Sequence, residues 1–152
     1  MDARAIVRLL GNTAAVEGGL SDKKRFLMNG LCDLIGADAW LWSLGTWGEP
    51  GDPPVYVGIM HGGFDENRFT KLLSIIEHPD NETIVSPWIA EVTRQKKHST
   101  YSLTDLDEAG LFSNSEVADL MEQADIGELF LSGYPVDESS MSAIGVYRAS
   151  GE

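Results

Sequence analysis

Apolar residues recur at helical spacing in two stretches at the start of the chain. Residues 3–16 repeat an apolar face every three or four positions, which predicts an amphipathic helix that ends at Gly18-Gly19. Ser21 is suited to cap a second helix, and Gly36 is placed to end it. The apolar faces are Ala3, Ile6, Val7, Leu10 and Ala14 in the first helix, and Leu27, Leu31, Leu34 and Ile35 in the second. Two helices therefore precede any strand.

After residue 38 the pattern changes to one that is typical of strands. Residues 39–47 are rich in tryptophan and leucine, and residues 55–61 are rich in β-branched and aromatic side chains, so both predict strands. The segment between them, residues 48–54, is dense in glycine and proline and too short for a crossover helix. We therefore expect a hairpin with a long loop and antiparallel pairing.

Helical spacing returns in the middle of the chain. Asp65 is expected to begin a third helix that closes at His78-Pro79, and Ser86-Pro87 to begin a short fourth helix. Ser113 with Glu116 has the spacing of a capping box and predicts a fifth helix. The inward-facing residues are Phe69, Leu72, Leu73 and Ile76 in the third helix, Trp88, Ile89 and Val92 in the fourth, and Val117, Leu120, Met121 and Ala124 in the fifth.

Three further strands complete the pattern. Residues 99–103 predict a short strand, and residues 128–136 and 142–148 predict a closing hairpin around a polar turn, although Pro135 is unfavourable inside a sheet. Two hairpins separated by helices favour an α+β fold with a central antiparallel five-stranded sheet. At 152 residues, we expect a single domain spanning 1–152.

The charge of the chain restricts its partners. Eleven basic and twenty-four acidic residues give a net charge of −13, so we expect neither direct nucleic-acid binding nor binding to an anionic membrane. Residues 94–98 form a basic run with the sequence RQKKH. It is interpreted as a solvated helix end that the helix dipole favours, with an anion site as the alternative.

The chain has one cysteine, Cys32, which excludes an internal disulfide and a multi-cysteine metal site. No apolar run reaches the length of a membrane span, and the N-terminus lacks the pattern of a signal peptide. We therefore expect a reduced, cytoplasmic protein.

The candidate chemistry gives little support for catalysis. His61, His78 and His98 are widely spaced, and no second histidine follows at ligand spacing, so no metal is expected. The chain also lacks a serine nucleophile elbow and a glycine-rich phosphate loop. We expect a protein that is not an enzyme and has no cofactor.

Strand alternation suggests where a ligand would bind. Phe130, Ser132 and Tyr134 share one strand face, where apolar walls carry hydroxyl groups as in small-molecule pockets. The same alternation places Tyr56 and Met60 on a common face. The candidate ligand-binding residues are these five and His61, which ends its strand beside Gly62-Gly63 at a possible pocket rim: Tyr56, Met60, His61, Phe130, Ser132 and Tyr134.

Two other features of the strands leave alternatives open. Trp40 and Trp42 share a face that is interpreted as a core covered by a helix. Glycines inside strands mark a bulge or a place where a ligand or helix comes close, and the pattern does not decide between these for Gly58, Gly133 and Gly145.

The two opening helices, the segment LCDLIGADA at 31–39 that leads into the first strand, and the closing segment AIGVYR at 143–148 resemble a GAF domain. More narrowly, they resemble the N-terminal sensor region of bacterial LuxR-type helix-turn-helix regulators. This resemblance implies N-terminal helices on one face of the sheet and a ligand pocket roofed by the middle segment on the other. It also implies a non-catalytic, signal-sensing domain that binds a small organic ligand or a partner. The first helix has an apolar stripe that a second copy of the chain could cover, so we also expect a homodimer.

The chain departs from the family pattern at several points. Asn67-Arg68-Phe69 differs from the asparagine-lysine-phenylalanine signature of cyclic-nucleotide GAF domains, so such a ligand is not expected. Cys32 lies on the second predicted helix, away from the pocket, which disfavours a covalent bilin and sulfoxide reductase chemistry. The sequence stops at Glu152 without a coupling helix or a helix-turn-helix, so we expect either a domain of a longer regulator, with the output domain outside this chain, or a domain that acts alone.

Three alternatives remain. A PAS-type sensor shares the order of strands, and a structure with one or neither opening helix packed on the sheet would favour it. A small enzyme would need acid or base groups that converge in a cleft. A structural interaction module would have a filled sheet face without a cavity.

Overall fold

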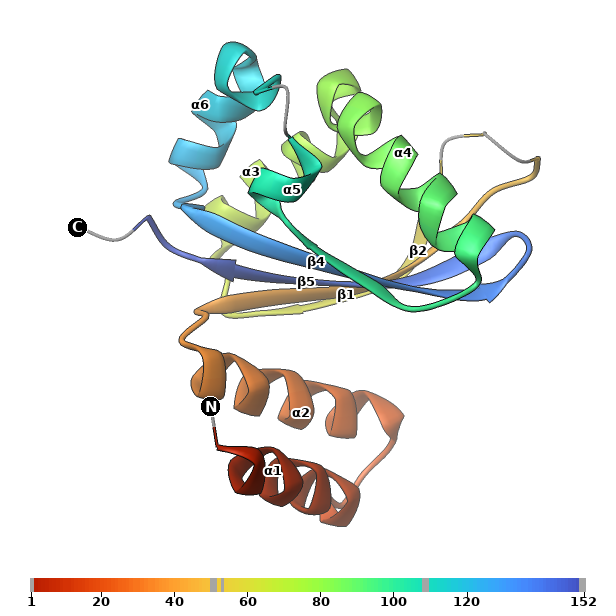
Figure 1. Ribbon diagram of the computed structural model, residues 1–152. Coiled ribbons are helices and arrows are strands. Elements are labelled where there is room, and N and C mark those ends of the chain that lie inside the picture. The colour runs from red at the N-terminus through yellow and green to blue at the C-terminus, as the bar shows by residue number, and fades with distance from the viewer. Residues whose placement is uncertain (1, 50–51, 53, 108–109, 151–152) are drawn as a thin grey trace.

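The computed structural model describes residues 2–49, 52, 54–107 and 110–150, and it places a five-stranded sheet between two groups of helices (Figure 1). The elements in chain order are α1 Ala3–Ala15, α2 Leu20–Ile35, β1 Ala39–Thr46, β2 Val55–Gly62, α3 Glu66–Glu77, α4 Pro79–Gln95, β3 Ser99–Ser102, α5 Leu103–Leu106, a 3-10 helix Phe112–Asn114, α6 Glu116–Gln123, β4 Glu128–Asp137 and β5 Ser140–Arg148.

The strands lie in the order β2-β1-β5-β4-β3, and every neighbouring pair is antiparallel. Both expected hairpins, β1 with β2 and β4 with β5, are present. The central contact is β1 with β5, which joins the two hairpins across the helical segment between them. The α+β class and the five-stranded antiparallel sheet are confirmed.

The N-terminal helices form two layers on one side of the sheet. α2 packs on β1 and β2, whereas α1 packs on α2, as Figure 1 shows. A side chain at Gly30 of α2 would collide with Leu9 of α1, so this glycine permits the close approach. Both N-terminal helices therefore lie on one side of the sheet, as expected, with α2 in contact with the strands and α1 outside α2.

The core under α2 is built around a tryptophan. Trp40 of β1 is 1% exposed and packs in one cluster with Met28, Cys32 and Val146. Its indole Nε1 donates a hydrogen bond of 2.8 Å to Asn29 Oδ1. The interpretation of the Trp40 face as a helix-covered core is confirmed. The predicted apolar stripe of α2 had omitted the two residues that α2 buries most, Met28 and Cys32.

The two ends of α2 differ in how well the sequence predicted them. Gly36 ends the helix as expected, with a left-handed φ of 71°. The expected cap at Ser21 was wrong: the helix is capped at Gly19, whose backbone N–H donates to Asp22 Oδ2 at 3.0 Å. A carboxylate three residues into the helix thus replaces the hydroxyl cap.

Helices α3 to α6 and the 3-10 helix cover the opposite side of the sheet, and we call them the roof (Figure 1). Asp65 begins α3 as expected, because its Oδ1 accepts from the Arg68 N–H at 2.7 Å. The expected short helix from Ser86 was wrong, since α4 begins at Pro79 and contains Pro87. Pro87 is exposed, so the carbonyl that it leaves unbonded can face water.

Two local signals were misassigned in the second half of the roof. α5 was not predicted: Ser102 Oγ accepts from the Asp105 N–H at 3.2 Å, while the Asp105 carboxylate accepts from the Ser102 N–H at 3.0 Å. The strand expected at residues 99–103 therefore ends at Ser102. Helix α6 is capped by Ser115, whose Oγ accepts from the Val117 N–H at 2.9 Å, rather than by Ser113.

Some expectations fall outside the described residues. Pro50, Gly51 and Pro53 of the expected loop between β1 and β2, and Glu152 at the end of the sequence, are among the residues that the structure does not describe. Within the described ranges, no helix combines the length and the apolar character that crossing a membrane requires.

Candidate functional site

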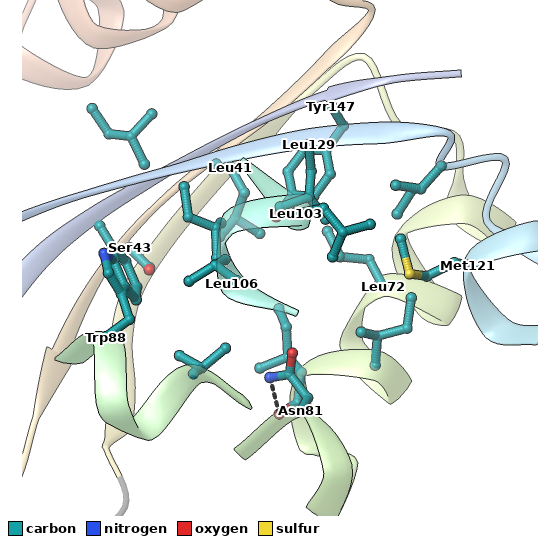
Figure 2. A pocket seen from close by; sticks show the side chains of 18 of the residues that line it. Leu41, Ser43, Leu72, Asn81, Trp88, Leu103, Leu106, Met121, Leu129 and Tyr147 are labelled. Atoms are coloured by element: carbon teal, nitrogen blue, oxygen red, sulfur yellow. Dashed lines mark hydrogen bonds between the residues drawn. The ribbon is translucent and has the colours of Figure 1, made fainter. Parts of the chain in front are cut away.

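A cavity lies between the sheet and the roof, and we call it the central cavity (Figure 2). The space open to the centre of a water-sized molecule is about 80 Å³. Its wall is mainly apolar and draws on β1, β2, β4, β5 and every roof helix. Representative wall residues are Leu41, Leu72, Ile75, Val85, Leu106 and Met121. The central cavity thus lies on the sheet face opposite α2.

Five polar side chains interrupt this apolar wall, namely Ser43, Tyr56, Asn81, Trp88 and Tyr147. Asn81 Nδ2 donates to the Ile76 carbonyl at 3.4 Å, which is drawn in Figure 2. No dashed line reaches Ser43 in that view, so its hydroxyl is not bonded to the other side chains drawn. The wall therefore has hydroxyl, amide and indole groups available to orient a bound molecule.

Both tyrosines of the wall stay neutral at ordinary pH. Burial raises the pKa of the Tyr147 phenol, and the nearby Tyr56 raises it further. Burial also raises the pKa of Tyr56. The physical cause is the same for both, because an apolar environment disfavours the charged phenolate. These groups can donate or accept hydrogen bonds, but they do not bring a charge to the central cavity.

Trp88 of α4 carries an unusual polar group. Its side chain is 6% exposed, and its indole Nε1 has no hydrogen-bond partner among the described residues. The ring packs edge-on to Tyr101, with 6.5 Å between ring centroids. Figure 2 shows Trp88 and Ser43 at the same end of the central cavity. A buried donor without a partner is rare in native proteins and calls for an explanation.

The strand glycines near the central cavity now have separate explanations. A Cβ at Gly133 would lie 2.9 Å from the Trp88 ring, so this glycine admits the approach of α4. A Cβ at Gly145 would lie 2.6 Å from the Tyr147 hydroxyl, so this glycine admits a phenol from its own strand. Gly58 instead has a left-handed φ of 63° and lies at an irregularity of β2.

That irregularity separates two of the candidate ligand-binding residues. Trp42 pairs with Met60, whereas Leu44 pairs with Val57, so β2 contains one extra residue there. Tyr56 lines the central cavity, while Met60 packs in the cluster under α2. The expectation that Tyr56 and Met60 share a face was wrong, because a bulge reverses the alternation of side chains.

His61 lies on the roof side of the sheet but outside the central cavity's wall. Its ring stacks on Phe69 of α3, with 3.7 Å between centroids and 16° between planes. Its Nδ1 is buried and has no hydrogen-bond partner among the described residues. Burial lowers the pKa of His61, and the Arg25 guanidinium lowers it further. The carbonyl of His61 accepts from Arg25 Nη1 at 3.0 Å.

The other three candidate residues lie on the opposite side of β4 from the central cavity. Leu129 and Leu131 of β4 line the cavity, and alternation turns Phe130, Ser132 and Tyr134 away from it. Phe130 is 46% and Tyr134 58% exposed. The face that we expected to form the pocket is therefore largely open to solvent, and of these three residues Phe130 borders a pocket beside Ile35 at the end of α2.

A small polar cluster lies on this open face. Thr100 Oγ1 of β3 lies 3.0 Å from Ser132 Oγ of β4, and His98 Nε2 hydrogen-bonds with the same hydroxyl. His98 belongs to the basic run 94–98, in which Lys96 and Lys97 are exposed, as expected for a solvated helix end. Ser132 thus contributes to the pairing of β3 with β4.

Sequence reasoning missed most of the cavity wall. Ser43, Trp88 and Tyr147 were read as strand or helix residues without a site role, yet all three line the central cavity. One signal was available: Leu41 and Ser43 alternate with Trp40 and Trp42, so a polar residue appears on the face without tryptophan.

Metal and thiol chemistry gain no support from the described residues. They contain no group of three or more histidine, cysteine or acidic side chains that could hold a metal ion. Cys32 lies on α2, on the sheet face away from the central cavity, and burial raises the pKa of its thiol to about 11. A thiol with a raised pKa is a poor nucleophile.

Comparison with known proteins gives structural matches. No family model matches the chain, and no curated protein sequence matches it. The LBD domain of VqsR from Pseudomonas aeruginosa matches with a TM-score of 0.59 and 11% identity, over 98% of this chain and 80% of that chain. CepR2 from Burkholderia cenocepacia, an N-acylhomoserine lactone dependent LuxR family transcription factor, matches with a TM-score of 0.58 and 10% identity, over 99% and 81%. GAF3 of Slr1393 from Synechocystis matches with a TM-score of 0.50 and 16% identity, over 86% and 77%.

These likenesses show the fold. The chain has a GAF-like fold that resembles the N-terminal sensor region of LuxR-type regulators. They also bear on the PAS alternative. Only α2 of the two opening helices packs directly on the sheet, which would favour a PAS-type sensor, but the VqsR, CepR2 and GAF3 structures that match this chain in fold favour the GAF-like interpretation.

Proposed function

We propose that this chain is the signal-sensing domain of a bacterial transcriptional regulator and that it binds a small organic molecule in the central cavity. The observation that carries the proposal is the cavity itself, an apolar space between sheet and roof with a few hydroxyl, amide and indole groups in its wall. Such composition is typical of sites that bind small molecules. The likeness in fold to the VqsR LBD domain and to CepR2 supports the same proposal.

The chemistry of the wall favours binding over catalysis. Among the described residues that line the central cavity, none carries a carboxylate, an imidazole or an amine. General acid-base catalysis needs such a group within hydrogen-bond reach of the substrate. An interaction module without a ligand is also disfavoured, because it would have a filled sheet face instead of a cavity.

A network around Arg68 offers a path from the roof to the residues that follow β5. The guanidinium of Arg68 in α3 donates to the Ala124 carbonyl at 2.8 Å, the Asp125 carbonyl at 3.2 Å and Asp38 Oδ1 at 2.9 Å. Asp125 Oδ1 in turn accepts from Ser150 Oγ at 2.8 Å. A ligand that binds one arrangement of the roof more tightly would shift its population and change this network.

The proposal includes a homodimer in the cytoplasm, with the output domain outside this chain. α1 exposes Ile6, Val7 and Leu10, which are 38%, 68% and 54% accessible to solvent. An apolar stripe of this kind is suited to pack against a second copy. Light scattering at high protein concentration tests the dimer, and a monomer there would remove this part of the proposal.

Native mass spectrometry of the freshly purified chain tests the sensor function. We expect a non-covalent adduct of small mass that is lost under denaturing conditions. Ala143→Leu places three more carbons in the wall of the central cavity and is expected to abolish the adduct. Ala15→Leu makes the same change at an exposed position of α1 and is expected to retain it. A folded chain that carries no adduct and takes up none from a cell extract would contradict the proposal.

A further inference from the structure

The C-terminal end of β5 lies between the segment that links α2 to β1 and the segment that links α6 to β4, and Figure 1 shows all three at the same end of the sheet. The Asp38 N–H donates to the Tyr147 carbonyl at 3.0 Å, and the Gly127 N–H donates to the Arg148 carbonyl at 2.8 Å. A Cβ at Gly127 would lie 2.5 Å from the Cα of Ser150, so this close approach depends on a glycine. The end of β5 is thus held on both sides.

Arg148 fixes the C-terminal end of α2. Its guanidinium donates from Nη2 to the Ile35 carbonyl at 2.8 Å and from Nε to the Gly36 carbonyl at 3.1 Å. The last carbonyls of a helix have no partner within the helix, so a cation beside them completes their hydrogen bonding and is favoured by the helix dipole. Nη1 of the same guanidinium donates to Glu128 Oε2 of β4 at 2.9 Å. Arg148 therefore joins the end of α2 to the sheet.

Asp38 makes the corresponding link to the roof. It lies two residues after Gly36, the C-cap of α2, and both oxygens of its carboxylate accept hydrogen bonds. Oδ1 accepts from Arg68 Nη2 of α3 at 2.9 Å, and Oδ2 accepts from the Ala149 N–H. The Arg68 side chain is 15% exposed, so salt screens this ion pair less than a fully exposed one. One carboxylate thus connects α3, the segment after α2 and the residue after β5.

Arg68 also orients a second acceptor of the residues that follow β5. Its Nη2 donates to the Asp125 carbonyl at 3.2 Å, and Asp125 Oδ1 accepts from the Ser150 N–H at 3.3 Å and from the Ser150 Oγ at 2.8 Å. We call Asp38, Arg68, Asp125 and residues 148–150 the C-terminal junction. A displacement of α3 that moved Arg68 would leave both aspartates without the cation that orients them.

We propose that the C-terminal junction is a coupling device that transmits a movement of α3 in the roof to the C-terminal end of α2, around the end of the sheet. This inference rests on the proposed sensor function, whose ligand would supply the movement, and it names the residues that carry the signal to the N-terminal helices. Arg68 and Arg148 are the two positioning residues, and Asp38 with Ala149 connects them. Loosening either arginine therefore weakens the contacts of the other.

A double-mutant cycle measures this coupling without any ligand. Arg68→Met and Arg148→Met each remove one guanidinium, and denaturant unfolding of the full chain gives the unfolding equilibrium constant of each single variant and of the double variant. Because the second substitution breaks contacts that the first has already weakened, we expect the increase in the double variant to be at least about twofold smaller than the product of the two single increases.

Arg94→Met combined with Arg148→Met is the matched control cycle. Arg94 pairs with Glu91 on the surface of α4, outside the C-terminal junction, so the two single effects should multiply.

Backbone amide signals in ¹H–¹⁵N spectra locate the effect, and they stand if the double variant does not fold. In Arg68→Met we expect the signal of Ala149 to move, together with those of Leu34 and Ile35 in the last turn of α2. The signal of Lys23, near the start of the same helix, should stay in place. Arg94→Met should move none of the four.

Either of two results overturns the inference: single effects that multiply in the first cycle, or spectra of Arg68→Met in which the last turn of α2 does not move. The sensor function has its own readout, the adduct in the mass spectrum. An adduct in a chain whose cycle shows no coupling would remove only the junction, and a coupled chain without an adduct would remove only the sensor function.

Discussion

The two faces of the sheet are covered in different ways, and the central cavity lies on the roof side. On one face α2 packs directly on β1 and β2, and the large ring of Trp40 fills the space beneath it together with Met28 and Val146. On the other face several helices of 3 to 17 residues meet over the strands, and their side chains leave the central cavity. The difference lies in the number of elements: α2 alone packs on the strands of the first face, whereas separate helices from several segments of the chain meet over the second.

The largest expected effect is a loss of stability on the sheet face that α2 covers. Trp40→Ala removes a fully buried ring, and we expect the free energy of unfolding to fall by about 3–5 kcal/mol, as for other buried tryptophans. Denaturant unfolding measures it. Glu122→Ala, at an exposed position of α6, is the control and should change stability by less than about 0.5 kcal/mol. A loss below 1 kcal/mol for Trp40→Ala would mean that α2 does not pack on this ring.

The next largest expected loss of stability is at the end of the roof, where Arg68 forms its hydrogen-bond network. Arg68→Met removes three hydrogen bonds from a guanidinium that is 15% exposed, and we expect a loss of about 2–3 kcal/mol because two carbonyls and Asp38 lose their donor. The same measurement on Arg94→Met, whose partner Glu91 is a surface neighbour, should show less than about 1 kcal/mol. Equal losses for the two variants would show that the Arg68 network does not hold the roof.

One substitution made on both faces compares them directly. Met28→Phe enlarges a side chain that is 1% exposed and packs in the cluster of Trp40, and we expect a loss of about 1–3 kcal/mol from overpacking. Met121→Phe makes the same change in the wall of the central cavity and should be neutral or stabilising. Paired unfolding curves measure the difference in the free energy of unfolding. If Met121→Phe is the more damaging of the two, the contrast between the faces fails.

The smallest effect is a dependence on pH at the edge of the roof. Because the pKa of His61 in the folded chain lies below its ordinary 6.5, protonation favours the unfolded chain. The stability that the neutral ring contributes is present above pH 6.5 and is lost as the pH falls through the folded pKa. Between pH 7.5 and 5, the free energy of unfolding should therefore fall more steeply with decreasing pH for the wild type than for His61→Gln, and denaturant unfolding at each pH measures it. The same pH dependence in both proteins would contradict this prediction.

Local patterns predicted the elements better than their ends. Periodicity and turn residues predicted the succession of strands along the chain and both hairpins. They also predicted the helical character of residues 3–15, 20–35 and 66–77. The errors lie where two signals compete over a few residues, as with Pro79 against Pro87 for the start of α4, or Ser113 against Ser115 for the cap of α6. Proline and serine fit both positions, and only packing decides between them.

The candidate site was predicted less well, for a specific physical reason. Of the six candidate residues, Tyr56 lines the central cavity, while Met60 and Phe130 lie on the other face of the sheet. Alternation tells which residues share a face, but it does not tell which face the roof covers. It also fails after Gly58, because one extra residue in β2 reverses every side chain beyond it.

By itself the sequence determined the α+β class, the two opening helices and the antiparallel hairpins, since these depend on spacing between near neighbours. Tertiary structure alone decided that β1 pairs with β5, that the faces are covered by α2 and by the roof, and that Ser43, Trp88 and Tyr147 meet around one cavity. These residues are far apart along the chain, and the contacts that bring them together depend on how whole elements pack, which no local pattern contains.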